Sequence, residues 1–205
     1  MAKQANTLSL DLISHLRRLN STRKKLEKLF TSGEITRLDI EQVYIGLYLD
    51  AIVSFERFIE QYFISLLVAG RLIAPPNTIP RVTFASSIVA RDVILGGKSY
   101  VDWLPYKFTE NRAEAFFRSG LPFTSLTKAE KNTIEDFMTI RNAIAHKSGH
   151  SIKKFETDII GNLTLPRKER TPSGFLRSIF RTTPMQTRYE NLILEMAAIA
   201  QKLTS

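Results

Sequence analysis

Apolar side chains recur every three to four residues through the first 32 positions, which is the spacing of one face of an α-helix. The repeat comprises Leu8, Leu12, Leu16, Leu19, Leu26, Leu29 and Phe30. Most intervening positions are polar or cationic, and Gly33 follows as a stop signal. The pattern predicts an amphipathic helix that ends near Gly33 and leaves its basic face to solvent.

A second and longer helical pattern begins behind residues 36–39 (TRLD), which resemble a capping box with Asp in place of Glu. Apolar residues continue at helical spacing from Val43 to Leu66, and Gly70 follows as a stop signal. The pattern predicts a helix of about 30 residues that forms the spine of the fold. The prolines within 74–80 cannot continue a helix, so that stretch is predicted to be a connector.

Shorter patterns follow in the middle of the chain. Residues 84–95 fit a helix by their spacing and a strand by their β-branched side chains, so both structures are left open. Residues 109–118 predict a short helix. Residues 127–130 (TKAE) form a better capping box, which opens a further helix, and Gly149 is well placed to stop it. The middle of the chain is therefore predicted to be mostly helical.

Periodicity is lost between residues 162 and 182, where prolines, a glycine and many cations predict a basic loop or short hairpin. Residues 183–186 (TPMQ) then combine a cap, a proline at the first helical position and a glutamine box. They predict a final helix that runs to about Leu203. The predicted fold class is all-α: a single helical bundle over residues 1–205, with a basic helix at 1–33 and an irregular basic insertion before the C-terminal helix.

Composition limits the compartment and the chemistry. A chain of 205 residues with 43% hydrophobic side chains is long enough to bury a real core. The absence of cysteine excludes disulfides, thiolate zinc sites and a cysteine nucleophile, and it suits a reducing cytosol. The first residues lack a signal-peptide core, and the most apolar run, 59–69, falls short of the ~20 residues that span a bilayer. We expect a cytoplasmic protein without a membrane anchor.

The net charge of +9 is concentrated in two parts of the chain. The first group lies in the first predicted helix and comprises Arg17, Arg18, Arg23, Lys24, Lys25 and Lys28. The second group lies beyond residue 150 and comprises Lys153, Lys154, Arg167, Lys168, Arg170, Arg177, Arg181 and Arg188. Such clusters suit a polyanion, either nucleic acid or an anionic membrane surface, although solvated helix faces give the same pattern.

Residues 141–146 (RNAIAH) place an arginine and one of only three histidines near the end of a predicted helix. Metal-independent RNA cleavage requires proton transfer near neutral pH, and histidine has an unperturbed pKa of ~6.5. The reaction also requires stabilisation of phosphate charge, and a guanidinium fork matches phosphate oxygens. Arg141 and His146 are therefore candidate catalytic residues.

The spacing of this pair raises a geometric question, because five residues leave two side chains about 140° apart on an ideal helix. A distorted or ending helix would bring Arg141 and His146 together within one chain. A homodimer offers another route, in which equivalent helices from two protomers line one cleft. Both routes are left open by the sequence.

The Arg-x4-His pattern, with a polar residue directly after the arginine, resembles the signature of the HEPN superfamily. Many HEPN proteins are metal-independent endoribonucleases. The resemblance implies a homodimer with a composite site, products that carry a 2′,3′-cyclic phosphate, and no cofactor. It implies that Asn142 orients the catalytic pair or the phosphate.

A second part of the resemblance lies in the long helix. The polar positions around Glu56 are similar to those that interrupt the long helix of HEPN domains of the RiboL-PSP group. In that case Glu56 would pair with Arg141 or hold its fork towards the substrate. Proteins of this kind commonly act as toxins or defence effectors, which implies a cognate antitoxin or a regulatory partner.

Cations near the motif are candidate RNA contacts. Lys147 and His150 follow it directly, and the set is completed by Lys153, Lys154, Arg177 and Arg181. Phe175 and Phe180 stand among these arginines, where they act either as base-stacking platforms or as hydrophobic anchors. His146 and His150 would hold zinc only on a continuous helix and with a third ligand, so we expect no metal site.

Two other functions fit the same chain. One is a non-catalytic helical RNA-binding or scaffolding module, whose affinity would not depend on His146. The other is an adaptor for an acidic protein or membrane surface, for which the basic helix at 1–33 is the main argument.

Overall fold

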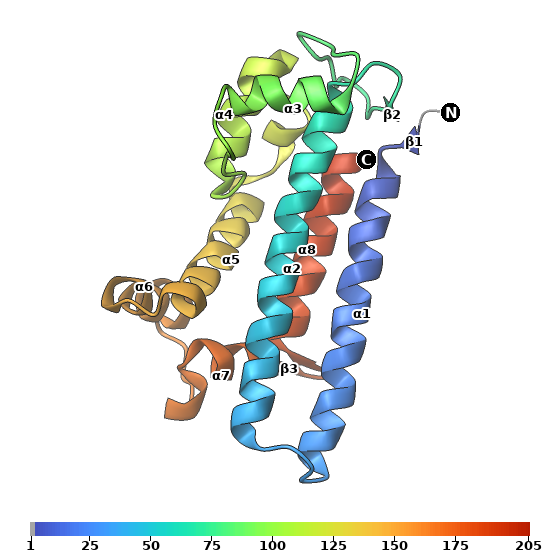
Figure 1. The fold of residues 1–205 in the computed structure, drawn as a ribbon. Coiled ribbons are helices and arrows are strands. Elements are labelled where there is room, and N and C mark those ends of the chain that lie inside the picture. Colours follow the sequence, from blue (N-terminus) through green and yellow to red (C-terminus); the bar gives the residue numbers. More distant parts are fainter. Residues whose placement is uncertain (1–2) are drawn as a thin grey trace. The chain divides into compact units, whose positions relative to one another are not determined.

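The computed structural model describes residues 3–205 and is 69% helical (Figure 1). Its helices are α1 (Asn6–Thr31), α2 (Arg37–Leu66), α3 (Ser87–Leu95), α4 (Tyr106–Phe116), α5 (Lys128–His146), α6 (Gly149–Phe155), α7 (Pro172–Arg177) and α8 (Arg188–Thr204). The fold class is therefore all-α, which confirms the prediction from hydrophobic periodicity. No helix within residues 3–205 has both the length and the apolar character needed to cross a bilayer.

Strands and short turns complete the described chain. Two strand pairs are present: β1 (Lys3–Gln4) runs parallel to β2 (Leu72–Ile73), and β3 (Ile179–Thr182) runs antiparallel to β4 (Met185–Thr187). The 3₁₀ turns are η1 (Arg118–Gly120), η2 (Phe123–Ser125) and η4 (Arg167–Glu169), and η3 (Glu156–Ile160) is a π-helical turn.

The described chain divides into two compact units. Unit 1 contains residues 3–13, 54–134 and 197–205, and unit 2 contains residues 14–53 and 135–196. α1, α2, α5 and α8 each begin in one unit and end in the other. The expectation of a single domain over residues 1–205 stays a prediction.

Unit 1 is built around an aromatic cluster on α2. The ring of Phe63 lies 5.0 Å from the rings of Trp103, Phe117 and Phe123. All four side chains are almost fully buried, so this cluster forms the core of the unit. The Tyr62 hydroxyl donates to the Leu203 carbonyl at 2.7 Å, which fixes α2 to the end of α8 within the unit.

Unit 2 is held by tyrosines on the first half of α2. The Tyr48 hydroxyl donates to the Phe137 carbonyl on α5 at 3.1 Å. Tyr44 contacts Tyr189 on α8 edge to face at 5.7 Å. These side chains are buried, and the hydroxyls of Tyr44 and Tyr48 are hydrogen-bonded, whereas the Tyr189 hydroxyl has no hydrogen-bond partner among the described residues. The first half of α2 is therefore tied to α5 and α8 inside this unit.

The predicted capping boxes form in α2 and α5. The Thr36 amide donates to the Asp39 carboxylate at 2.8 Å, and the Thr127 amide donates to the Glu130 carboxylate at 2.7 Å. In return, each threonine hydroxyl accepts the acidic residue's amide at 3.3 Å. Both helix starts could therefore be read from four-residue patterns, because a capping box is a local interaction.

The expected end of α5 at Gly149 is wrong. The helix ends at His146, and Lys147 leaves helical geometry with a φ of +48°. The Ser148 side chain then caps a new helix, α6, in which Gly149 is the first residue. The Ser148 hydroxyl accepts a hydrogen bond from the Ser151 amide, which is the interaction that starts a helix. Gly149 therefore lies inside a new helix and does not end the previous one.

The segment left open at 84–95 is the helix α3. Ser86 caps it by accepting the Val89 amide, and Gly96 ends it in the left-handed region with a φ of +53°. Spacing was therefore a better guide here than the β-branched residues, since capping residues at both ends fix the helix.

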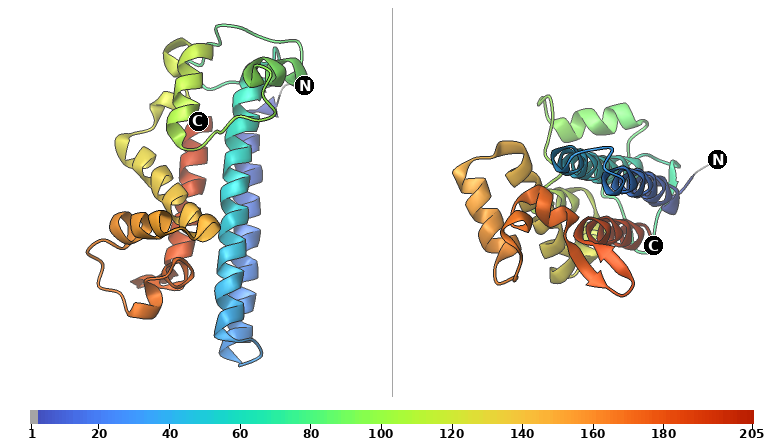
Figure 2. Two further views of the ribbon diagram at one scale, coloured as in Figure 1. Left: turned by 60° about the vertical axis from the view of Figure 1, so that its left-hand side comes forward. Right: turned by 90° about the horizontal axis from the view of Figure 1, so that it is seen from below.

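The basic segment 162–182 contains more order than a loop. It includes η4, the helix α7 and the strand β3, and β3 pairs with β4 just beyond it (Figure 2). The predicted helix start at residues 183–186 is wrong, because Thr182 pairs with Met185 and leaves Thr183 and Pro184 as the turn of the hairpin. α8 begins at Arg188 instead, behind a capping box in which the Thr187 amide donates to Glu190 at 3.0 Å.

Candidate functional site

The catalytic pair expected from the sequence is in contact within one chain. Arg141 and His146 lie on the last two turns of α5, in unit 2. Nη1 of Arg141 is 3.3 Å from Nε2 of His146, and it donates to Oδ1 of Asn142 at 3.0 Å. The three predicted catalytic residues therefore form one hydrogen-bonded group.

The end of α5 allows this contact. On an ideal helix the two residues stand about 140° apart and about 7.5 Å apart along the axis. The arginine side chain is long enough to cross the last turn, and His146 is the final helical residue before the chain turns at Lys147. Of the two routes left open by the sequence, an ending helix therefore suffices to bring the pair together.

The charge on Arg141 is not neutralised by a carboxylate. Within residues 3–205 it forms no ion pair with an acidic side chain, and its two partners are an amide oxygen and an imidazole nitrogen. Arg141 is half-buried and His146 is exposed. A half-buried guanidinium without a counter-ion attracts an anion, because its charge is only weakly screened by water.

An N–H group of Arg141 can donate to His146 only if Nε2 carries a lone pair. The contact at 3.3 Å therefore corresponds to a neutral imidazole with its proton on Nδ1, a tautomer inferred from this hydrogen bond. A neutral imidazole of this kind is a base, whereas its protonated form is an acid. The pair thus has the functional groups required for proton transfer beside an anion.

The four candidate RNA contacts that follow the pair are all exposed. Lys147 lies between α5 and α6, and His150, Lys153 and Lys154 lie on α6. His150 precedes the two lysines by three and four residues, so the three side chains are neighbours on the helix surface. Lys154 forms an ion pair with Asp158, which leaves Lys147 and Lys153 as the two lysines of this group without one among the described residues.

The other predicted site residues lie elsewhere. Arg181 is exposed on β3, whereas Arg177 at the end of α7 is held by a bidentate ion pair with Glu27, at 2.8 and 3.1 Å. Glu56 belongs to unit 1, where its carboxylate accepts the Trp103 amide at 3.3 Å. Its expected pairing with Arg141 stays a prediction.

The two candidate stacking residues differ in exposure. Phe175 is 6% exposed and packs edge to face on Phe155 at 5.7 Å, so it is a hydrophobic anchor. Phe180 on β3 is 46% exposed, and the guanidinium of Arg188 lies 5.9 Å from its ring. Of the two, only Phe180 is exposed enough to contact a nucleobase.

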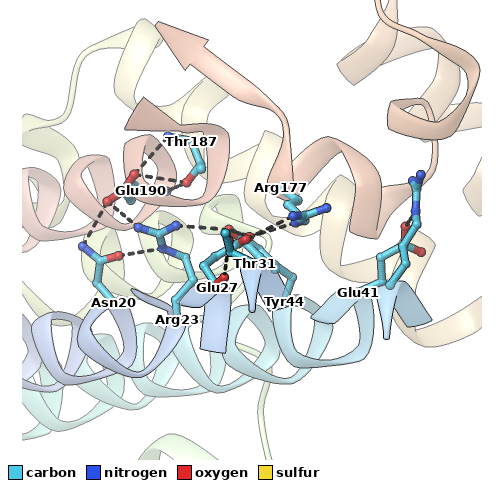
Figure 3. A network of polar contacts seen from close by, with 10 residues as sticks. Asn20, Arg23, Glu27, Thr31, Glu41, Tyr44, Arg177, Thr187 and Glu190 are labelled. Atoms are coloured by element: carbon cyan, nitrogen blue, oxygen red, sulfur yellow. Dashed lines mark hydrogen bonds and ion pairs between the residues drawn. The ribbon is translucent and has the colours of Figure 1, made fainter. Parts of the chain in front are cut away.

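A polar network that the sequence did not predict joins the elements of unit 2 (Figure 3). Arg23 is 6% exposed, donates to the Tyr44 hydroxyl at 3.1 Å and pairs with Glu190 at 2.6 Å. The Tyr44 hydroxyl donates in turn to Glu27 at 2.9 Å, and Glu27 accepts the fork of Arg177. The network therefore connects α1, α2, α7 and α8 within the unit.

The network shifts the pKa of both of its carboxylates. For Glu27, burial acts to raise the pKa, but hydrogen bonds from Arg177 and Tyr44 and the nearby guanidinium charges outweigh it and lower the pKa. For Glu190, burial is likewise outweighed by the Thr187 amide and by Arg23, so its pKa is also lowered. Both carboxylates are therefore stabilised in their charged form.

The sequence pattern placed Arg23 on the solvent-exposed basic face of the first helix. This prediction is wrong, because Arg23 is buried. One signal in the sequence points the other way: Arg23 lies at heptad spacing behind Leu16, and four residues behind Leu19, on the apolar side of α1. Its acidic partner lies 167 positions away in sequence, and such a contact has no local signature.

No group of three or more potential ligand side chains within residues 3–205 is arranged to hold a metal ion. The comparisons with known proteins are also negative: no family model matches the chain, and neither a curated protein nor a solved structure does. The resemblance to HEPN therefore rests on residues 141–146 and on the polar positions around Glu56.

Proposed function

We propose that the protein is a metal-independent endoribonuclease of HEPN type that cleaves RNA with Arg141 and His146. The observation that carries this proposal is the 3.3 Å contact between Nη1 of Arg141 and Nε2 of His146, in a group completed by Asn142. A cation without a carboxylate partner and an exposed imidazole at its side are suited to a phosphodiester. The fold class is compatible with the proposal but does not distinguish HEPN from other helical bundles.

The chemistry follows from these groups. A phosphate oxygen of the substrate takes over the guanidinium of Arg141, which frees the lone pair on Nε2 of His146. That nitrogen accepts the proton of the ribose 2′-hydroxyl while the 2′-oxygen attacks phosphorus. The P–O5′ bond breaks, and the imidazolium returns its proton to the departing 5′-oxygen. The products are a 2′,3′-cyclic phosphate and a 5′-hydroxyl.

Asn142 and the surrounding cations have supporting roles. The Asn142 amide oxygen holds Arg141 on the side from which the guanidinium reaches His146. Lys147 and Lys153 supply exposed positive charge close to the pair in sequence, where an RNA backbone would continue beyond the scissile phosphate. In this function the partners are RNA, a second protomer and an antitoxin or regulatory protein.

The decisive experiment is cleavage of labelled total RNA by the purified protein in EDTA, with analysis of the fragment ends. His146→Ala should abolish cleavage, whereas His150→Ala, which removes a neighbouring exposed imidazole, should retain most of it. Fragments that end in 2′,3′-cyclic phosphates would support the proposal. Equal activity of wild type and His146→Ala would exclude it.

A non-catalytic RNA-binding module is the second candidate, and the exposed cations of α6 and the preceding turn favour it. In that case RNA binds with an affinity that decreases steeply with salt, and neither wild type nor His146→Ala cleaves it. Lys153→Glu should weaken binding under both functions, so only turnover separates them.

A further inference from the structure

Unit 2 contains a cavity of about 620 Å³, and neither Arg141 nor His146 lines it. Its walls are formed by α1, the start of α2, η4, α7, the β3–β4 hairpin and the start of α8. This volume falls within the range of about 300–1,000 Å³ that small-ligand sites occupy. The polar network of Figure 3 lies in the same wall, since Arg23, Glu27 and Glu190 line the cavity.

The cavity carries an excess of positive charge. Six cationic side chains line it against four carboxylates, which leaves two positive charges uncompensated. The cations are Arg23, Lys24, Lys28, Arg37, Lys168 and Arg177, and the carboxylates are Glu27, Glu41, Glu169 and Glu190.

The arginines and the lysines of this cavity differ in their partners. Each arginine is held by a carboxylate: Arg23 by Glu190 at 2.6 Å, Arg37 by Glu41 at 2.7 Å and Arg177 by Glu27 at 2.8 Å. Fixed in this way, the arginines form the wall and add little net charge.

The lysines supply the excess charge. Lys28 and Lys168 form no ion pair within residues 3–205, and Lys24 lies 3.7 Å from a Glu190 oxygen that Arg23 already occupies. Lys24 and Lys28 stand four residues apart on α1, a spacing at which like charges destabilise a helix. Lysines from α1 and η4 thus line one cavity, and the repulsion between Lys24 and Lys28 makes α1 less stable as an isolated helix.

Arg177 adds one more donor. Its Nε and Nη2 atoms are taken by Glu27, and its guanidinium stacks on the Phe30 ring at 4.3 Å. The third nitrogen, Nη1, has no hydrogen-bond partner among the described residues, so its N–H groups are free to donate to a ligand. A rigid N–H donor beside three mobile ammonium groups suits an anion with several oxygens.

We infer that this cavity binds a compact polyphosphate anion. Three lysines in one cavity match a ligand with several adjacent phosphates, because each ammonium group can take a different phosphate oxygen. The inference concerns a site separate from the RNA-cleaving pair and does not depend on cleavage.

Calorimetric titration of the full chain with inorganic tripolyphosphate, at matched ionic strength, tests the inference. Wild type and His146→Ala should both bind one equivalent. Lys28→Glu and Lys168→Glu should each weaken binding by about tenfold or more, as expected for loss of a charge-assisted contact. Lys25→Glu is the matched control: the same charge change on the same helix, outside the cavity, should alter affinity by less than about twofold.

Circular dichroism should first show that all variants have the wild-type helix content. Absence of saturable binding, or equal weakening by Lys25→Glu and Lys28→Glu, would overturn the inference. A short single-stranded RNA forms the second arm, measured with the His146→Ala protein. If RNA binding requires Lys28 but tripolyphosphate does not bind, the cavity is part of an RNA surface and a compact ligand is excluded.

Discussion

At the scale of single residues, the arginines of unit 2 differ in their partners. Arg23 and Arg177 are each engaged by a carboxylate, whereas Arg141 is held only by neutral groups. A guanidinium paired with a carboxylate has little attraction left for a phosphate, while an unpaired one keeps it. Of these three arginines, Arg141 is thus the best suited to bind a phosphate with its whole fork, whereas Arg177 keeps only Nη1 without a partner among the described residues.

Replacing Arg141 by lysine tests whether the planar fork is needed in addition to the charge. Lysine keeps the positive charge but cannot hold a phosphate oxygen and the imidazole side by side. We expect Arg141→Lys to lower kcat/KM for RNA cleavage by about tenfold or more, with Arg141→Ala lower still. Wild-type turnover in Arg141→Lys would mean that charge alone suffices.

Glu27 should make the stability of the fold depend on acid. Its pKa in the folded chain is lower than the value of about 4.3 for an unfolded glutamate, so its stabilising effect is complete above that pH. The effect is lost as the pH falls through the lower pKa of the folded state. Glu27→Gln should therefore cost about 1–3 kcal/mol at neutral pH, and the difference from wild type should shrink in acid.

Denaturant titrations at neutral pH and at several acidic pH values measure this difference. Glu114→Gln, which removes an exposed carboxylate of α4, is the control and should change stability little at any pH. A deficit of Glu27→Gln that stays constant down to the most acidic pH would contradict the role assigned to the Glu27 charge.

At the scale of elements, the feature that shapes the candidate site is the break between α5 and α6. Lys147 occupies the left-handed region, where a side chain with a Cβ atom is strained and glycine is not. The strained residue directly follows His146, the last residue of the Arg-x4-His motif and of α5. A lysine at this position combines a helix end with a cation that directly follows His146 in the chain.

Lys147→Gly should relieve this strain. We expect the free energy of unfolding to increase by about 0.5–1 kcal/mol, while RNA affinity decreases because a cation is lost. Lys147→Ala removes the same cation but keeps the strain, so it should bind RNA equally weakly without the gain in stability. If the two variants were equally stable in chemical denaturation, the strain would be absent.

The elements that could be predicted are those with local signatures. The starts of α2 and α5 followed from capping boxes, and the pairing of Arg141 with His146 was anticipated as one of two routes. The end of α5 was misplaced because Ser148 and Gly149 send opposite signals. The helix α7 does have a local signal, since Thr171 caps it and Pro172 is its first residue, but with six residues it is too short to show a helical period.

At the scale of the whole molecule, the candidate site can be built from one chain or from two. The contact between Arg141 and His146 lies within a single chain, whereas the resemblance to HEPN implies a site composed from two. Hydrophobic periodicity predicts helices but not their association, because the same apolar face can pack within a chain or between chains. The all-α class could therefore be predicted from periodicity, whereas the homodimer that the resemblance implies stays a prediction.

Mixing two inactive variants distinguishes these arrangements. If each site takes its arginine and its histidine from the same chain, a mixture of Arg141→Ala and His146→Ala should remain inactive, and this is the result we expect. If each site combines the arginine of one chain with the histidine of the other, co-refolding should restore activity to about a quarter of the sites. Light scattering on the mixture verifies whether dimers are present.

The passage of four helices through both compact units bears on how such a protein can change over evolutionary time. Unit 1 is assembled from three separate stretches of the chain and unit 2 from two. Neither unit is encoded as one contiguous block, so a recombination event cannot transfer either of them intact. Divergence is then expected to proceed by point substitution and by insertion between helices. Sequence similarity between relatives would then decrease along the whole chain, because no contiguous module could be transferred with its sequence unchanged.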